Sequence, residues 1–114
     1  MTAEATGVRI EVMELRMRLE RASTVAVSRA CHRNNPMESR NVAAGLLFVL
    51  DSAAEGQWLS TYHNVKLAGY VYRRTSDVLH GRTSAFNVSA VVLDEWKTVV
   101  DALAELVALG ERPR

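Results

Sequence analysis

The chain has 114 residues, a formal net charge of +1, 48% hydrophobic residues and 24% charged residues. This length allows one small domain with a single core, and the composition is that of an ordinary globular protein. A net charge so close to zero excludes a bulk electrostatic attraction to nucleic acid. The single cysteine, Cys31, excludes an intramolecular disulfide and favours a reducing compartment. The longest apolar run, Val42 to Leu50, is too short to cross a bilayer, so we expect a cytoplasmic protein without membrane contact.

The N-terminal part of the chain has the residue spacing of an amphipathic helix. Residues 1–7 are small and polar, so we expect them to be disordered and a helix to span residues 8–34. Apolar side chains recur there in alternating steps of four and three residues, which is heptad spacing: Val8, Val12, Leu15, Leu19, Ala22 and Ala26. Two interpretations remain open. The stripe packs on the rest of its own domain, or Val8, Val12, Leu15 and Leu19 form a homodimer interface.

Residues 36–110 are expected to form a helical core. Asn35 and Pro36 form a helix start signal, supported by Glu38 in the first turn. The run Val42–Leu50 that follows is apolar on nearly every side, and a helix of that kind is buried on every side. We therefore expect a central core helix that contains Phe48.

The C-terminal segment predicts one more helix. Asn87 or Ser89 can cap its start, and Gly110 can end it. Its apolar residues follow a 3.6-residue period: Val92, Trp96, Val99, Val100, Leu103, Leu106 and Val107. Because no segment favours a strand, we predict an all-α fold of about five helices in one domain, residues 1–114.

A basic and aromatic segment, residues 59–82, is the main indication of function. Ser60 can start a helix, Gly69 can break it, and His80-Gly81-Arg82 closes the segment. A short helix, a glycine turn and a basic helix form the outline of a unit that reads the major groove of DNA. The residues that we expect to contact DNA are Lys66, Tyr72, Arg73, Arg74, Ser76, Asp77, His80 and Arg82.

Leu59-Ser60, Gly69 and Leu79-His80-Gly81-Arg82 resemble the helix-turn-helix of the Cro/repressor (Xre-type) family, over roughly residues 42–109. The resemblance implies that Gly69 makes the turn between a scanning helix and a recognition helix. It also implies a DNA-binding transcription regulator. The sequence departs from the family pattern at Val65, where a small residue is usual, and at Ala68, where a large aliphatic residue is usual.

Two other interpretations of the same segment remain open. Tyr62, Tyr70 and Tyr72 can be half-buried core residues beside a solvated row of arginines. Alternatively, the segment can bind another protein, because tyrosine, tryptophan and arginine are the residues that most often anchor protein interfaces.

Catalytic and metal motifs are not found in the sequence. Cys31 and His32 are neighbours and would lie on different faces of a helix, and the three histidines lack metal-ligand spacing. We therefore predict a protein that is not an enzyme and needs no cofactor. The leading hypothesis is a homodimeric regulator that binds double-stranded DNA. The alternative is a helical protein-interaction module, either an adaptor or a subunit of a complex.

Overall fold

Four α-helices and two short 3-10 helices form the protein in the computed structural model, which describes residues 3–30, 41–81 and 84–111. The α-helices are α1 (Ala3–Ala30), α2 (Val42–Leu46), α3 (Trp58–Leu79) and α4 (Ala90–Glu111); the 3-10 helices are η1 (Leu47–Ser52) and η2 (Ala85–Asn87). The described residues contain no strand. The predicted all-α single domain is therefore confirmed, with four α-helices where about five were expected.

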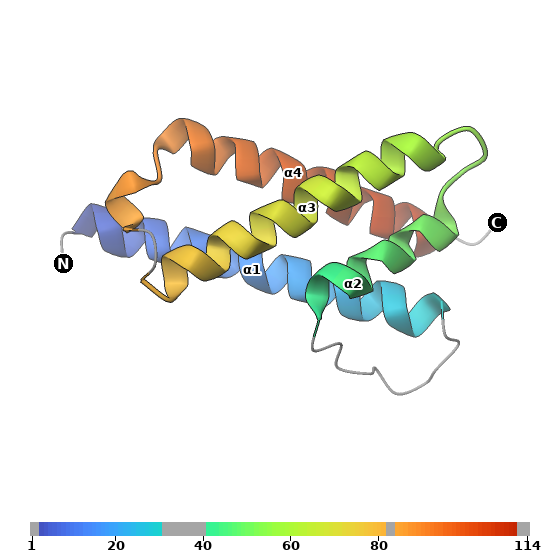
Figure 1. Cartoon of the computed structure of the whole chain (residues 1–114), viewed down its shortest axis with the longest axis horizontal. Helices are drawn as coiled ribbons and strands as arrows, with labels where there is room; N and C mark the ends of the chain where they lie inside the picture. The colour runs from blue at the N-terminus through green and yellow to red at the C-terminus, as the bar shows by residue number, and fades with distance from the viewer. Residues whose placement is uncertain (1–2, 31–40, 82–83, 112–114) are drawn as a thin grey trace.

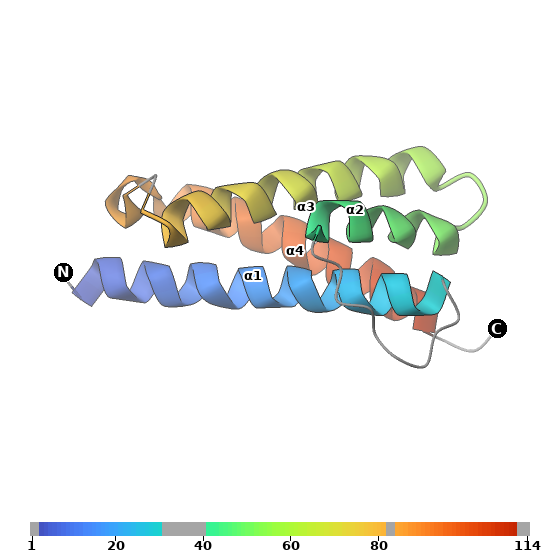
Figure 2. The same cartoon turned by 60° about the horizontal axis from the view of Figure 1, so that its bottom comes forward.

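The three long helices α1, α3 and α4 run along the longest axis of the molecule, whose extents are 48 × 30 × 21 Å (Figure 1). α3 is antiparallel to both α1 and α4, as Figures 1 and 2 show from two directions. The shorter α2 and η1 lie beside α3 over the C-terminal half of α1 (Figure 2). Because α1 contacts α2, α3 and α4, the core is built around it.

The heptad-like stripe of α1 packs inside its own chain. Val12, Leu15 and Leu19 are all buried in the core, and Val8 packs half-buried against it. This is the packing expected if the stripe belongs to its own domain. Val12, Leu15 and Leu19 are covered by the other helices and are not available to the predicted dimer interface, of which only Val8 keeps exposed apolar surface. The ends of the helix also differ from the prediction. α1 already starts at Ala3, within the segment expected to be disordered, and residues 31–34 lie outside the described residues.

The segment expected to be a central helix is instead a short element on the outside of the bundle. Asn41 caps α2 through its side-chain oxygen, which accepts a hydrogen bond from the Ala44 backbone N–H at 3.1 Å. The start signal predicted at residues 35–38 lies outside the described residues. Leu46 is fully buried, but Phe48 is 39% exposed, because α2 and η1 pack only one side against α1 and α3.

α3 is one uninterrupted helix of 22 residues that passes straight through Gly69. The glycine turn of a helix-turn-helix is therefore absent, and that part of the prediction is wrong. A glycine inside a helix costs only about 1 kcal/mol, and buried residues on both sides of Gly69 offset this cost: Thr61, Val65, Ala68, Val71, Thr75 and Val78. The left-handed glycines are Gly56, before α3, and Gly81, which follows its C-cap as predicted.

α4 follows the prediction closely. The Ser89 hydroxyl oxygen accepts a hydrogen bond from the Val92 N–H at 3.1 Å and caps the helix, and its apolar stripe is buried at Trp96, Val100 and Leu103. The helix runs to Glu111, one residue beyond the predicted end. None of the helices in the described ranges has the length and hydropathy that a membrane span needs.

Candidate functional site

The residues predicted to contact DNA do not form one surface. All of them that the structure describes lie on α3 or at its C-cap, His80, and Arg82 lies outside the described residues. Lys66, Arg73 and His80 are exposed. Arg74 forms an ion pair with Asp77 at 3.3 Å, one turn along the same helix. The other two residues, Tyr72 and Ser76, face α1.

Tyr72 and Ser76 belong to a polar network between α1 and α3. The guanidinium carbon of Arg16 lies 4.6 Å from the centre of the Tyr72 ring, and an Arg16 nitrogen donates a hydrogen bond to the Ser76 hydroxyl oxygen. Arg16 also pairs with Glu20 at 3.0 Å, and the Tyr72 hydroxyl donates to Glu20 at 3.4 Å. Burial raises the pKa of Tyr72, the Arg16 charge lowers it, and Glu20 raises it further. These two side chains therefore stabilise the helix pair and are not free to read bases.

The outward side of α3 carries a row of aromatic and cationic side chains. Trp58 and Tyr62 stack with their ring centres 5.4 Å apart and their planes 4° apart, and the Lys66 ammonium lies 5.6 Å from the centre of the Tyr62 ring. Tyr70 and Arg73 continue the row one and two turns further on. Residues four apart are neighbours on a helix surface. We call Trp58, Tyr62, Lys66, Tyr70 and Arg73 the α3 outer face.

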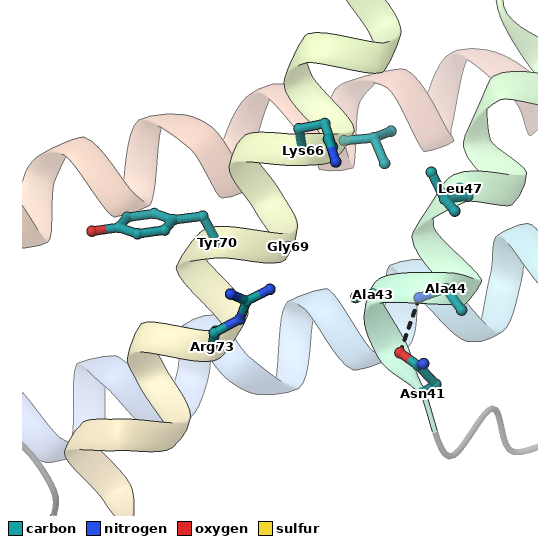
Figure 3. Close-up of a pocket in the computed structure, with 9 residues that line it drawn as sticks. Asn41, Ala43, Ala44, Leu47, Lys66, Gly69, Tyr70 and Arg73 are labelled. Atoms are coloured by element: carbon teal, nitrogen blue, oxygen red, sulfur yellow. Dashed lines mark hydrogen bonds between the residues drawn. The ribbon is translucent and has the colours of Figure 1, made fainter.

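A groove of about 300 Å³ lies between the α3 outer face and α2 (Figure 3). It is lined by small, apolar and cationic residues: Asn41, Ala43, Ala44, Leu47, Val65, Lys66, Gly69, Tyr70 and Arg73. In Figure 3 Lys66 and Arg73 lie on either side of Gly69, with Ala44 of α2 and Leu47 of η1 across the groove. A Cβ atom added at Gly69 would lie 3.9 Å from the Ala43 Cβ, an ordinary contact, so packing does not require glycine there. The missing side chain leaves the floor of the groove open.

The charged side chains that line this groove, among the described residues, are all cationic. None of these lining residues is an aspartate or glutamate, and neither Lys66 nor Arg73 forms an ion pair with any residue that the structure describes. Between α1 and α4, in contrast, the cationic side chains are paired with carboxylates. There Lys97 pairs with Glu11 at 3.0 Å, which raises the pKa of Lys97, and Arg18 pairs with Asp101 at 2.7 Å.

Sequence reasoning identified Lys66 and Arg73 but missed most of their surroundings. One of the open interpretations makes Tyr70 a half-buried core residue, although it is 54% exposed, and Gly69 is predicted to be a turn, although it lies within α3. The steps of four residues from Trp58 through Tyr62 and Lys66 to Tyr70 would have placed these residues on one helix face. The α2 side of the groove has no comparable signal, because short apolar residues on an exposed edge look like core residues.

A second exposed apolar group lies on α1, where Ile10, Met13 and Met17 are about half exposed. These residues are spaced three and four apart and lie on the side of the helix away from the core. They do not line the groove between α2 and α3.

No group of three or more histidine, cysteine, aspartate or glutamate side chains in the described ranges could hold a metal ion. A scan against protein-family models finds no match for the chain. Searches of curated proteins and of solved structures find no significant match either. What the α3 outer face and its groove can bind is therefore inferred from their own residues.

Proposed function

We propose that the protein is a non-enzymatic helical interaction module that binds another protein through the α3 outer face and the neighbouring groove. One observation carries this proposal. Large apolar and aromatic side chains remain exposed here although the core is complete without them: Leu47, Trp58 and Tyr70. Exposed apolar patches with aromatic and arginine residues are typical of protein-binding surfaces. A cytoplasmic location, expected from the single cysteine, is part of the same proposal.

Duplex DNA is less well supported as the ligand of this surface. The expected recognition unit required a turn at Gly69, and α3 has none. Of the eight predicted contact residues, Tyr72 and Ser76 bind α1 and Arg74 is paired with Asp77. Among the predicted contacts in the described ranges, His80 is exposed, and Lys66 and Arg73 are exposed cations without an ion pair; two such cations are few for a strong contact with a phosphate backbone.

Photo-crosslinking in the cells that make the protein tests the proposal. Tyr70 is replaced by p-benzoylphenylalanine, a similar aromatic side chain, and in a control protein the exposed Thr98 on α4 is replaced in the same way. We expect a discrete protein adduct from position 70 and none from position 98. Adducts of equal yield from both positions, or no adduct from position 70, would contradict the proposal. A gel-shift assay with duplex DNA is run in parallel, and retention at low salt that Arg73→Ala abolishes would favour DNA as the ligand.

A further inference from the structure

We propose that the partner segment is an acidic amphipathic α-helix, which places an apolar side chain in the groove between α2 and α3 and a carboxylate between Lys66 and Arg73. This inference rests on the proposed function and names the chemistry of the partner. Three features of the groove carry it: its shape, its charge and its position in the molecule.

The shape of the groove suits a helix. Two helical elements form its sides, with Leu47 on one wall and α3 on the other, and its floor is built from the small residues Ala43, Ala44 and Gly69 (Figure 3). Small residues allow a partner helix to approach closely, and an apolar wall gives its anchor residue a surface to pack against. An amphipathic helix that docks in a hydrophobic groove is a common mode of peptide recognition.

The charge of the groove selects an acidic partner. Lys66 and Arg73 lie on the same side of α3, about one turn on either side of Gly69 (Figure 3). Neither forms an ion pair with a described residue, and none of the described residues that line the groove is a carboxylate. A partner carboxylate over Gly69 is within the reach of both side chains and forms charge-assisted hydrogen bonds with them. A basic partner is repelled by the same two cations.

A second copy of this chain is a poorer occupant of the groove. Its α4 is acidic, with Asp94, Glu95 and Glu105 exposed, and would complement the groove in charge. That contact would join two different surfaces, and such a heterologous contact continues into rings or open chains of molecules. A segment of a different, acidic protein fills the groove without creating a further contact of the same kind, so a complex of defined size results.

Selection from a displayed random-peptide library tests the proposal on the whole protein. We expect enriched peptides with aspartate or glutamate beside apolar residues at helical spacing, three and four apart. Their binding should fall at least about tenfold, which is 1.4 kcal/mol, with Lys66→Glu or Arg73→Glu. The matched charge reversal Arg21→Glu, at an exposed position on α1, should leave binding unchanged.

A steric variant separates loss of the groove from loss of charge. Gly69→Leu adds a side chain at the groove floor without changing any charge. A Cβ atom at this position makes an ordinary contact with Ala43, and leucine is the better helix former. We expect this variant to lose peptide binding while its circular dichroism spectrum stays that of the wild type.

The inference is overturned by enriched peptides without an acidic preference, by binding that neither Arg73→Glu nor Gly69→Leu changes, or by no enrichment at all. Binding of oligo-dT to the wild-type protein is measured as well. If it binds, and the same variants lose this binding, the inference is overturned in favour of single-stranded nucleic acid as the ligand. If the adduct at position 70 forms while the peptide selection fails, the proposed interaction module is supported and only the proposed acidic helical partner is contradicted.

Discussion

Tyr72 shows how one side chain can mislead a reading of the sequence. Its position in a basic segment suggested contact with DNA, whereas its ring lies against the Arg16 guanidinium and its hydroxyl donates to Glu20. The sequence contained one half of this arrangement, because Arg16 and Glu20 are four residues apart on one helix. The other half depends on the register between α1 and α3, which no local pattern specifies.

Arg16 is the residue whose loss should disturb this contact most. Arg16→Ala removes the cation–π contact with Tyr72, the ion pair with Glu20 and the hydrogen bond to Ser76. Because the site is only partly buried, we expect the free energy of unfolding to fall by about 1–2 kcal/mol. Urea denaturation measures it. Arg21→Ala, at an exposed position of the same helix, serves as the control and should change the value by less than about 0.5 kcal/mol.

The raised pKa of Tyr72 gives the stability of the protein a pH dependence at the alkaline end. Burial favours the neutral phenol in the folded state, so the unfolded chain loses this proton first, as the pH rises through 10.0, the ordinary pKa of tyrosine. The contribution of Tyr72 is complete below that pH and declines as the pH rises through the higher folded pKa. Tyr72→Phe should therefore lose less stability than wild type between about pH 9 and pH 11. Tyr70→Phe, at an exposed site, should follow wild type; if Tyr72→Phe also does so, the phenol does not titrate as described.

At the scale of whole elements, the helices that are covered on one side and polar on the other were the easiest to predict. α4 has a clear 3.6-residue period with capping residues at its start, and its predicted and observed bounds nearly coincide. The segment Val42–Leu50 was predicted less well, because a run of apolar residues has no period that distinguishes a buried helix from a half-exposed one. The division of this segment into α2 and η1 depends on which of its sides packs against α1 and α3, and the sequence of the segment does not specify that side.

Two substitutions in this segment distinguish a central helix from one packed on a single side. Leu46 is fully buried, so Leu46→Ala should lower the free energy of unfolding by about 2–5 kcal/mol. Phe48 is 39% exposed, so Phe48→Ala should cost clearly less than the roughly 3–5 kcal/mol of a fully buried phenylalanine. Chemical denaturation of both variants decides between the arrangements. A larger loss for Phe48→Ala than for Leu46→Ala would place the segment back in the centre of the core.

The molecule as a whole has an uneven distribution of charge that its net charge of +1 conceals. α3 carries three cationic side chains against one carboxylate, whereas α4 carries one cationic side chain against five carboxylates. α1 lies against both helices and provides Glu11 and Arg18 to the ion pairs with α4. The cationic side of the molecule is therefore the side with the groove.

The fold closes within a single chain, because the α1 stripe lies in its own core. Unfolding should then be independent of protein concentration, whereas a dimer held by this stripe would become more stable as the concentration rises. We expect the same urea midpoint at about 1 µM and about 100 µM, and Leu19→Ala should lower it equally at both. A midpoint that rises with concentration in wild type but not in Leu19→Ala would restore the dimer interface at this stripe.

The groove, the α3 outer face and the absence of a DNA-reading turn all depend on one structural claim, that α3 passes through Gly69 as a single helix. The stability of Gly69→Ala, measured by chemical denaturation beside that of Gly81→Ala, tests this claim most directly. In a continuous helix the new Cβ makes an ordinary contact 3.9 Å from the Ala43 Cβ, so the free energy of unfolding should rise by about 0.5–1 kcal/mol. Gly81, at a φ of 76°, should instead lose stability on the same substitution. A loss of stability for Gly69→Ala as well would place a turn at Gly69 and contradict the single helix.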